Sequence, residues 1–126
     1  MELDERLQTE RNIWLATVRP DGTPHLTPIW FAWVDGRAYI CTLESNVKTR
    51  NVRANPHIMF SLESGDAPAV AEATVDVLQR PYPRFVVDAF AAKFAWDITK
   101  PDDEGPYDAL WEITVDRWLM GGSPPA

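Results

Sequence analysis

The sequence predicts a mostly β fold in which six or seven antiparallel strands close into a barrel with flanking helices. Short apolar runs rich in β-branched and aromatic residues recur along the chain with turn signals between them, and helical periodicity is confined to three segments. Hairpin connections make neighbouring strands antiparallel, and closing the sheet into a barrel removes its exposed edges. A chain of 126 residues can bury one continuous core, so we expect a single domain over residues 1–126.

The first part of the chain is expected to form one helix followed by strands. Leu3 and Leu7 fall on the same side of a helix over residues 1–10. The turn sequences Pro20-Asp21-Gly22 and Asp35-Gly36 then separate apolar runs as hairpins. The strands expected in this part lie at 13–18, 25–34 and 37–42.

The rest of the chain is expected to form two more helices and three more strands. The expected elements are a helix at 45–54, strands at 58–62 and 69–78, a helix at 84–96 and a strand at 109–119. The helix at 84–96, which should pack on the barrel, follows from apolar residues at helical spacing. These are Phe85, Ala89, Ala92 and Trp96, with Val86, Phe90 and Lys93 beside them. Residues 100–107 are acidic and contain Pro and Gly, which is typical of a loop near a functional site.

Pro28 interrupts the long strand predicted at 25–34. Proline cannot donate a hydrogen bond to a neighbouring strand, so we expect the strand to bulge, bend or lie at an edge there. A bend would expose the backbone of residues 27–31 to a ligand. Trp30 would then face either this cleft or the core, because the register around Pro28 decides its side of the sheet.

The overall charge excludes generic nucleic-acid binding. The formal net charge is −7 and the sequence pI is about 4.7, so the surface as a whole repels polyanions. Lys48, Arg50 and Arg53 form a local exception, with three cations in six residues. Such a cluster in an acidic protein suits a small anionic ligand better than a duplex.

The cationic cluster lies at the start of a predicted helix. Ser45 or Asn46 can cap this helix, so its free N–H groups and the Lys48 ammonium can converge on one anion, such as a phosphate. The alternative is a solvated basic helix that ends at Asn55-Pro56. Both interpretations remain open at this point.

Several other kinds of site are disfavoured by the residues present. Cys41 is the single cysteine and lies in an apolar run, which indicates a buried structural thiol in a reducing compartment. His25 and His57 both lie beside prolines at strand starts, where we expect strand-end residues rather than general bases. We find no metal-ligand cluster, nucleophile elbow, phosphate loop or dinucleotide motif, so no catalytic residue or metal ligand is assigned. Without a signal peptide or a membrane-spanning run, we expect a cytoplasmic protein with no membrane partner.

Three segments resemble, in order and spacing, the pyridoxamine 5'-phosphate oxidase-like family of FMN-binding split β-barrels. These segments are residues 15–25, 28–31 and 48–56. The resemblance implies a homodimer that holds two flavins, or two deazaflavin coenzymes, in clefts between its subunits. It also places the phosphate-binding lysine of the family at Lys48, and the run 48–51 is similar to the branch that includes deazaflavin-dependent reductases.

The resemblance and the capping argument together give a set of candidate cofactor-binding residues. The family's strand segment along the flavin ring falls on Thr27, Pro28, Ile29, Trp30 and Phe31. The phosphate side falls on Thr42, Lys48, Arg50 and Asn51, with Ser45 and Asn46 at the helix start. The implied cofactor is FMN or, alternatively, the deazaflavin coenzyme F-420.

The implied function is an oxidoreductase that transfers a hydride to or from a small conjugated substrate. In this interpretation the cofactor carries the hydride chemistry, and the protein supplies orientation and electrostatics. The alternative is a non-catalytic carrier or sensor of flavin or another heterocycle, because residues that hold a cofactor look the same in both cases.

Overall fold

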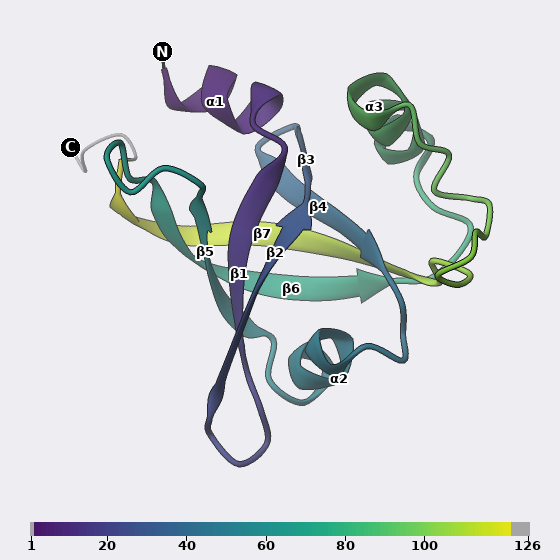
Figure 1. Cartoon of the computed structure of the whole chain (residues 1–126), viewed down its shortest axis with the longest axis horizontal. Coiled ribbons are helices and arrows are strands. Elements are labelled where there is room, and N and C mark those ends of the chain that lie inside the picture. Colours follow the sequence, from purple (N-terminus) through teal and green to yellow (C-terminus); the bar gives the residue numbers. More distant parts are fainter. Residues whose placement is uncertain (1, 122–126) are drawn as a thin grey trace.

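The computed structural model describes residues 2–121, which form seven strands and three helices (Figure 1). The helices are α1 (Leu3–Thr9), α2 (Val47–Ala54) and α3 (Arg84–Phe94). The strands are β1 (Asn12–Val18), β2 (Pro24–Trp30), β3 (Ala32–Val34), β4 (Arg37–Thr42), β5 (His57–Leu62), β6 (Val70–Leu78) and β7 (Ala109–Met120). Figure 1 shows α1 and α3 at one end of the sheet and α2 at the other. Within residues 2–121, no helix has the length and apolar character that crossing a membrane requires.

The strands form one antiparallel sheet that curls into a barrel. Their order is β2-β1-β5-β6-β7-β4-β3, so β2 and β3 lie at opposite ends of the sheet. Phe31 alone separates these two strands along the chain. The chain therefore holds the two ends of the sheet together, which confirms the predicted antiparallel barrel.

The strand predicted at 25–34 is interrupted at Phe31 and not at Pro28. Pro28 pairs in regular register with Trp14 of β1, and the pairing runs without a shift through β2. An edge strand tolerates proline because one side of its backbone has no partner. The prediction of an edge position was therefore right, and the predicted bend at Pro28 was wrong.

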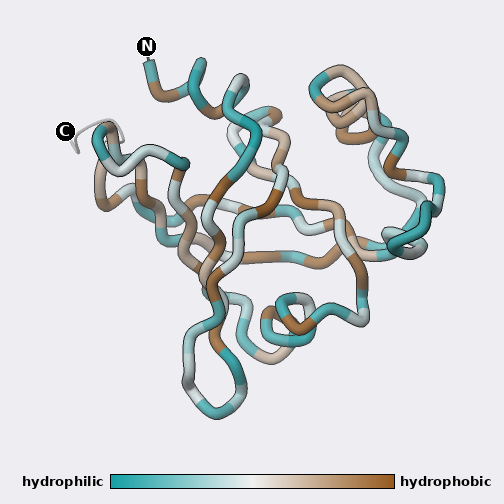
Figure 2. The backbone as a smooth tube through the Cα atoms, viewed as in Figure 1, coloured by the Kyte–Doolittle hydropathy of each residue, from teal (hydrophilic) through white to brown (hydrophobic). Residues whose placement is uncertain are grey.

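The core lies between the inner faces of the strands. Burial alternates residue by residue in β1 and β5, as expected for strands with one face inward. The largest buried side chains of this main cluster are Leu7, Ile13, Leu15, Phe31, Ile40, Phe60, Leu62 and Trp111. A second cluster lies under α3 and contains Tyr39, Val86, Phe90, Ile98 and Leu110. Figure 2 shows the contrast between the hydrophobic strand interiors and the hydrophilic tip of the β1–β2 hairpin.

The flanking helices use partly different faces from those predicted. Leu7 of α1 is buried, as its spacing predicted. In α3 the buried residues are Val86 and Phe90, whereas Phe85 of the main apolar run is 45% exposed. Trp96 lies beyond the helix, which ends at Ala95 in the left-handed conformation with φ of 51°. The side chains of α3 that fill the core therefore come from the row beside the main apolar run, Val86 and Phe90.

Helix α2 is joined to the sheet by a buried hydrogen bond. Asn51 is 2% exposed, and its Nδ2 donates to Thr17 Oγ1 over 3.0 Å. Thr17 is itself buried on β1. This bond fixes the face of α2 that is turned toward the β1–β2 hairpin.

We predict that Asn51→Ala lowers the free energy of unfolding by about 1–3 kcal/mol, because the buried Thr17 hydroxyl loses its partner. Urea unfolding followed by circular dichroism measures the change. Arg50→Ala is the matched control, since Arg50 is the exposed neighbour on the same helix and should change stability by less than about 0.5 kcal/mol. Equal stabilities of the two variants would contradict a structural role for Asn51.

Candidate functional site

A cavity of about 680 Å³ lies where β2 separates from β4. β3 pairs with β4 only through residues 37–39, and continuing this register would place Trp30 opposite Cys41. Instead, the chain turns away from β4 at Phe31, and β2, which precedes Phe31, pairs with β1 alone. Trp30 and Cys41 thus line opposite walls of an open seam, and the backbone edges of both strands are available to a ligand there.

The cavity brings together segments that are distant in sequence. Its lining residues are Pro28, Ile29 and Trp30 of β2, Cys41 and Thr42 of β4, Asn46 and Lys48 at the start of α2, and Trp96, Asp102, Asp103, Glu104 and Tyr107 of the α3–β7 connection. Six of these belong to the set proposed from the sequence: Pro28, Ile29, Trp30, Thr42, Asn46 and Lys48.

Five other residues of the proposed set do not line this cavity. Thr27 of β2 is partly buried and lies next to the lining residue Pro28 but outside the lining. The side chain of Phe31 is fully buried, and that of Asn51 is bonded to Thr17, so both have packing roles. The Phe31 backbone is also occupied, because its N–H donates to Arg11 O and its carbonyl accepts a bond from Lys93 Nζ. Ser45 and Arg50 are exposed and are not part of the lining.

Lys48 is a half-buried cation at the α2 end of the cavity. Among residues 2–121, no carboxylate forms an ion pair with it, and burial lowers the pKa of its ammonium group. Asn46 occupies the N-cap position of α2, but its Nδ2 donates to Thr42 Oγ1 over 2.8 Å and its side chain accepts no bond from the first turn. An unpaired cation beside an uncapped helix N-terminus forms a favourable environment for an anion.

An aromatic group forms the wall beside β2. Trp30 is 40% exposed and stacks on Phe94, with ring centroids 4.4 Å apart and an interplanar angle of 7°. The guanidinium of Arg11 lies 4.7 Å from the Trp30 ring centroid, and Trp96 meets Trp30 edge-on at 6.3 Å. Trp30 therefore lines the cavity and is not a core residue, which favours the first of its two predicted placements.

The α3–β7 connection supplies an acidic wall. The hydroxyl of Tyr107 donates to Asp102 Oδ2 over 2.8 Å and lies 3.2 Å from Glu104 Oε2. Burial and these carboxylates raise the pKa of Tyr107. The sequence indicated a loop here from its composition but gave no signal for individual residues. Within residues 2–121, no group of three or more His, Cys, Asp or Glu side chains is arranged to hold a metal ion.

The inner face of β2 carries two buried polar atoms that lack partners. Alternation places His25, Thr27 and Ile29 on this face, all of them partly buried. In the described part of the chain, three buried side-chain atoms have no hydrogen-bond partner: His25 Nδ1, Thr27 Oγ1 and Trp111 Nε1. Leaving a buried polar group unpaired costs free energy, so two such atoms on one strand face indicate a place for a polar group of a ligand.

The comparison with known proteins agrees with this geometry. A family model described as "Pyridoxamine 5'-phosphate oxidase" matches residues 1–120. The chain belongs to this family. Membership in the pyridoxamine 5'-phosphate oxidase family confirms the resemblance that the sequence segments indicated. No curated protein matches the chain.

Solved structures of similar fold carry different names. A structure described as an F420 reductase is 24% identical, with a TM-score of 0.73, and the match covers 91% of this chain and 94% of that one. A conserved hypothetical protein from Mycobacterium tuberculosis is 27% identical, with a TM-score of 0.73 and coverage of 94% and 82%. HutZ, a heme storage protein from Vibrio cholerae, is 16% identical, with a TM-score of 0.77 and coverage of 97% and 96%. These likenesses establish the split-barrel fold.

The position of Cys41 gives a prediction about its reactivity. Cys41 is 5% exposed, its Sγ lies 3.7 Å from the carbonyl of Tyr107, and burial raises the pKa of the thiol to about 12. The thiol is therefore protonated at pH 8. Only the thiolate form of cysteine reacts rapidly with alkylating reagents. We expect iodoacetamide to modify the folded protein at least a hundred-fold more slowly than the urea-unfolded protein, with mass spectrometry as the readout. Equal rates would show that Cys41 is accessible and ionised.

Proposed function

We propose that the protein is a cytoplasmic oxidoreductase that binds FMN in the cavity at the seam and transfers a hydride to or from a small conjugated substrate. The observation that carries this proposal is the unpaired, half-buried Lys48 at one end of a cavity whose other walls are open strand edges and aromatic rings. FMN would supply the hydride chemistry, and the protein would supply binding and orientation.

The residues of the cavity fit the parts of this cofactor. Lys48 and the first turn of α2 suit the terminal phosphate, because both favour negative charge. The free backbone edge at Pro28, Ile29 and Trp30 suits the polar edge of the ring system, and the Trp30 side chain suits its flat face. A volume of about 680 Å³ lies within the range of cofactor pockets, roughly 300–1,000 Å³.

The charges around the cavity favour FMN over the deazaflavin coenzyme F-420. The deazaflavin coenzyme extends beyond its phosphate in an acidic tail, which needs additional cations. Arg53 is paired with Glu44, its Nε donating over 2.9 Å, and is not available for that role. Asp102, Asp103 and Glu104 also repel a polyanionic tail on the far side of the cavity.

The role of Lys48 is tested by comparing two ligands that differ only in the phosphate. We expect Lys48→Ala to weaken FMN binding by about 1.5–3 kcal/mol, the range for a hydrogen bond to a charged group, and to leave riboflavin binding unchanged. Quenching of flavin fluorescence gives both dissociation constants. Lys100→Ala is the matched control, because Lys100 is exposed and lies outside the cavity lining.

Two results would contradict the proposal. Unchanged FMN affinity in Lys48→Ala would remove its phosphate role, and tight binding of the deazaflavin coenzyme without binding of FMN would reverse the choice of cofactor. Binding of FMN without turnover of any conjugated acceptor would instead support the alternative function of a carrier or sensor.

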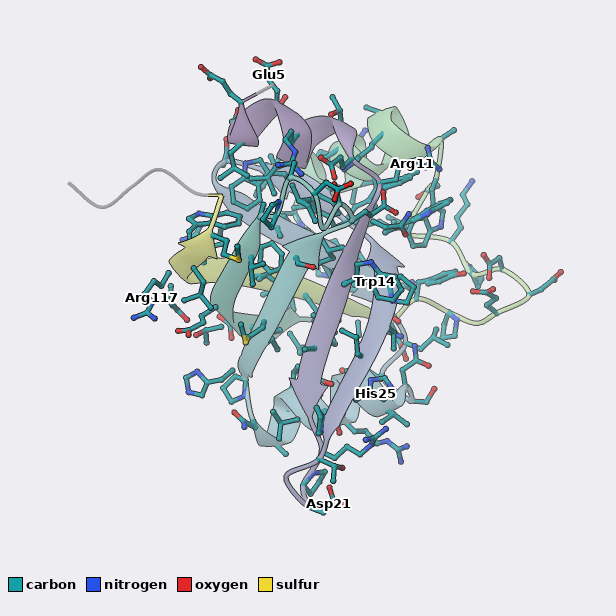
Figure 3. The ribbon with its side chains drawn as sticks, turned by 60° about the vertical axis from the view of Figure 1, so that its left-hand side comes forward. Glu5, Arg11, Trp14, Asp21, His25 and Arg117 are labelled. Atoms are coloured by element: carbon teal, nitrogen blue, oxygen red, sulfur yellow. The ribbon has the colours of Figure 1, made fainter. Side chains whose placement is uncertain are left out.

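We also infer that the protein forms a homodimer through the outer face of β2, β1 and β5. The exposed apolar residues there include Trp14, Leu26 and Met59, which are 41%, 63% and 39% exposed. The register places Ala16 between Leu26 and Met59, so an apolar row crosses the three strands. Figure 3 shows Trp14 projecting from the neighbouring row of this face. An apolar patch that spans several strands is typical of an interaction surface.

We predict that Leu26→Asp shifts the protein from dimer to monomer, because a carboxylate on this face would be buried without a partner. Analytical ultracentrifugation at micromolar concentration measures the change. Leu119→Asp is the matched control, since Leu119 is 39% exposed on β7, outside the proposed surface. A stable 14.3 kDa monomer in the unmodified protein would overturn the proposed dimer, whose interface should bury more than about 2,000 Å².

A further inference from the structure

The inner face of β2 continues from the cavity toward the β1–β2 hairpin. Ile29 lines the cavity, and alternation places Thr27 and His25 on the same face of β2, beyond the cavity lining. Figure 3 shows His25 near the hairpin end of the strand. His25 lies opposite Thr17 in the β1–β2 register. Thr17 Oγ1 accepts a bond from Asn51, and no hydrogen bond joins Thr17 to the imidazole of His25, whose Nδ1 has no partner.

The charged groups whose fields act on His25 are cations. They are Arg19 at the end of β1 and Lys48 on α2, and both lower the pKa of the imidazole, in addition to a larger effect of burial. Arg19 is held in place by its Nη1, which donates to the carbonyl of Pro24 over 2.7 Å. Burial and these two cations therefore disfavour the protonated imidazole in the chain alone, and its Nδ1 is covered without a partner.

We propose that the imidazole of His25, with the hydroxyl of Thr27, forms the second half of the anion site opposite Lys48 and takes up a proton when the phosphate group of the ligand binds. This inference rests on the proposed function, because it concerns the same phosphate. It adds a residue, His25, that sequence analysis assigned to a strand end.

The proton uptake by His25 follows from the opposite charges of the bound phosphate and of the two nearby cations. A bound phosphate carries about −1.5 to −2 charges near neutral pH and offsets the field of Arg19 and Lys48. The protonated imidazole then donates from Nδ1 to a phosphate oxygen, and the Thr27 hydroxyl donates to the same group. Binding therefore raises the pKa of His25, so the affinity contributed by His25 increases as the pH falls.

The test measures FMN binding between pH 5.5 and 8 in the unmodified protein and in His25→Gln. The phosphate itself titrates in this range, but its contribution is the same in both proteins and cancels in the ratio of their dissociation constants. We expect this ratio to favour the unmodified protein increasingly toward low pH, by about tenfold if binding raises the His25 pKa by one unit. His57→Gln is the matched control, because His57 is the other histidine of the chain and is exposed at the start of β5.

A second measurement reports the proton directly. Titration calorimetry with FMN at pH 6.5, in two buffers of different ionisation enthalpy, gives the number of protons taken up. This number should be larger for the unmodified protein and for His57→Gln than for His25→Gln.

The outcomes separate this inference from the proposed function. A constant affinity ratio across the pH range, with equal proton uptake in all three proteins, overturns the role of His25. If FMN binding still depends on Lys48 in that case, the proposed function stands without it. If none of the proteins binds FMN, the proposed function and this inference both fail.

Discussion

The structure depends on the single residue between its two edge strands. Phe31 joins β2 to β3 and is fully buried, and Lys93 donates to its carbonyl over 2.8 Å while lying 4.0 Å from the centre of its ring. This junction forces the ends of the sheet together. β3 is only three residues long, however, so its pairing with β4 stops where β2 turns away. After Phe31, the pairing of β3 with β4 closes the barrel. Before Phe31, β2 does not pair with β4, and the seam between these two strands stays open.

In the proposed function, the charge distribution around the seam would select for a small anion. In a chain of net charge −7, a small anion approaches against the overall field, so binding requires a local cation that its own carboxylates do not neutralise. Arg53 is neutralised by Glu44 on the surface, whereas Lys48 is turned into the cavity and half-buried. A lower effective dielectric strengthens its attraction for an anion, and the acidic wall at residues 102–104 confines that attraction to the α2 end.

Sequence reasoning succeeded where local pattern determines structure and failed where distant packing does. Alternation and turn signals located the strands within a few residues, with β2 and β3 predicted as one strand, because strand formation is expressed in short-range periodicity. Proline marked an edge strand correctly, but the actual break at Phe31 depends on β2 pairing with β1, which its own residues do not show. The inward face of α3 could not be chosen from the sequence for a similar reason. Its two adjacent apolar rows have similar patterns, and only the packing of Val86 and Phe90 into the core distinguishes them.

The role proposed for His25 had no signal in the sequence, although its neighbour Thr27 was among the candidate residues. A histidine beside a proline has no distinguishing pattern, and the meaning of His25 comes from the register that covers its Nδ1 and from the cations near it. Folding leaves this atom and Thr27 Oγ1 without partners at a cost in stability. A ligand that supplies the missing partners recovers that cost as binding free energy. The unpaired atoms on the inner face of β2 lower the stability of the free protein. Hydrogen bonds from these atoms to an anionic group would therefore contribute to its binding free energy.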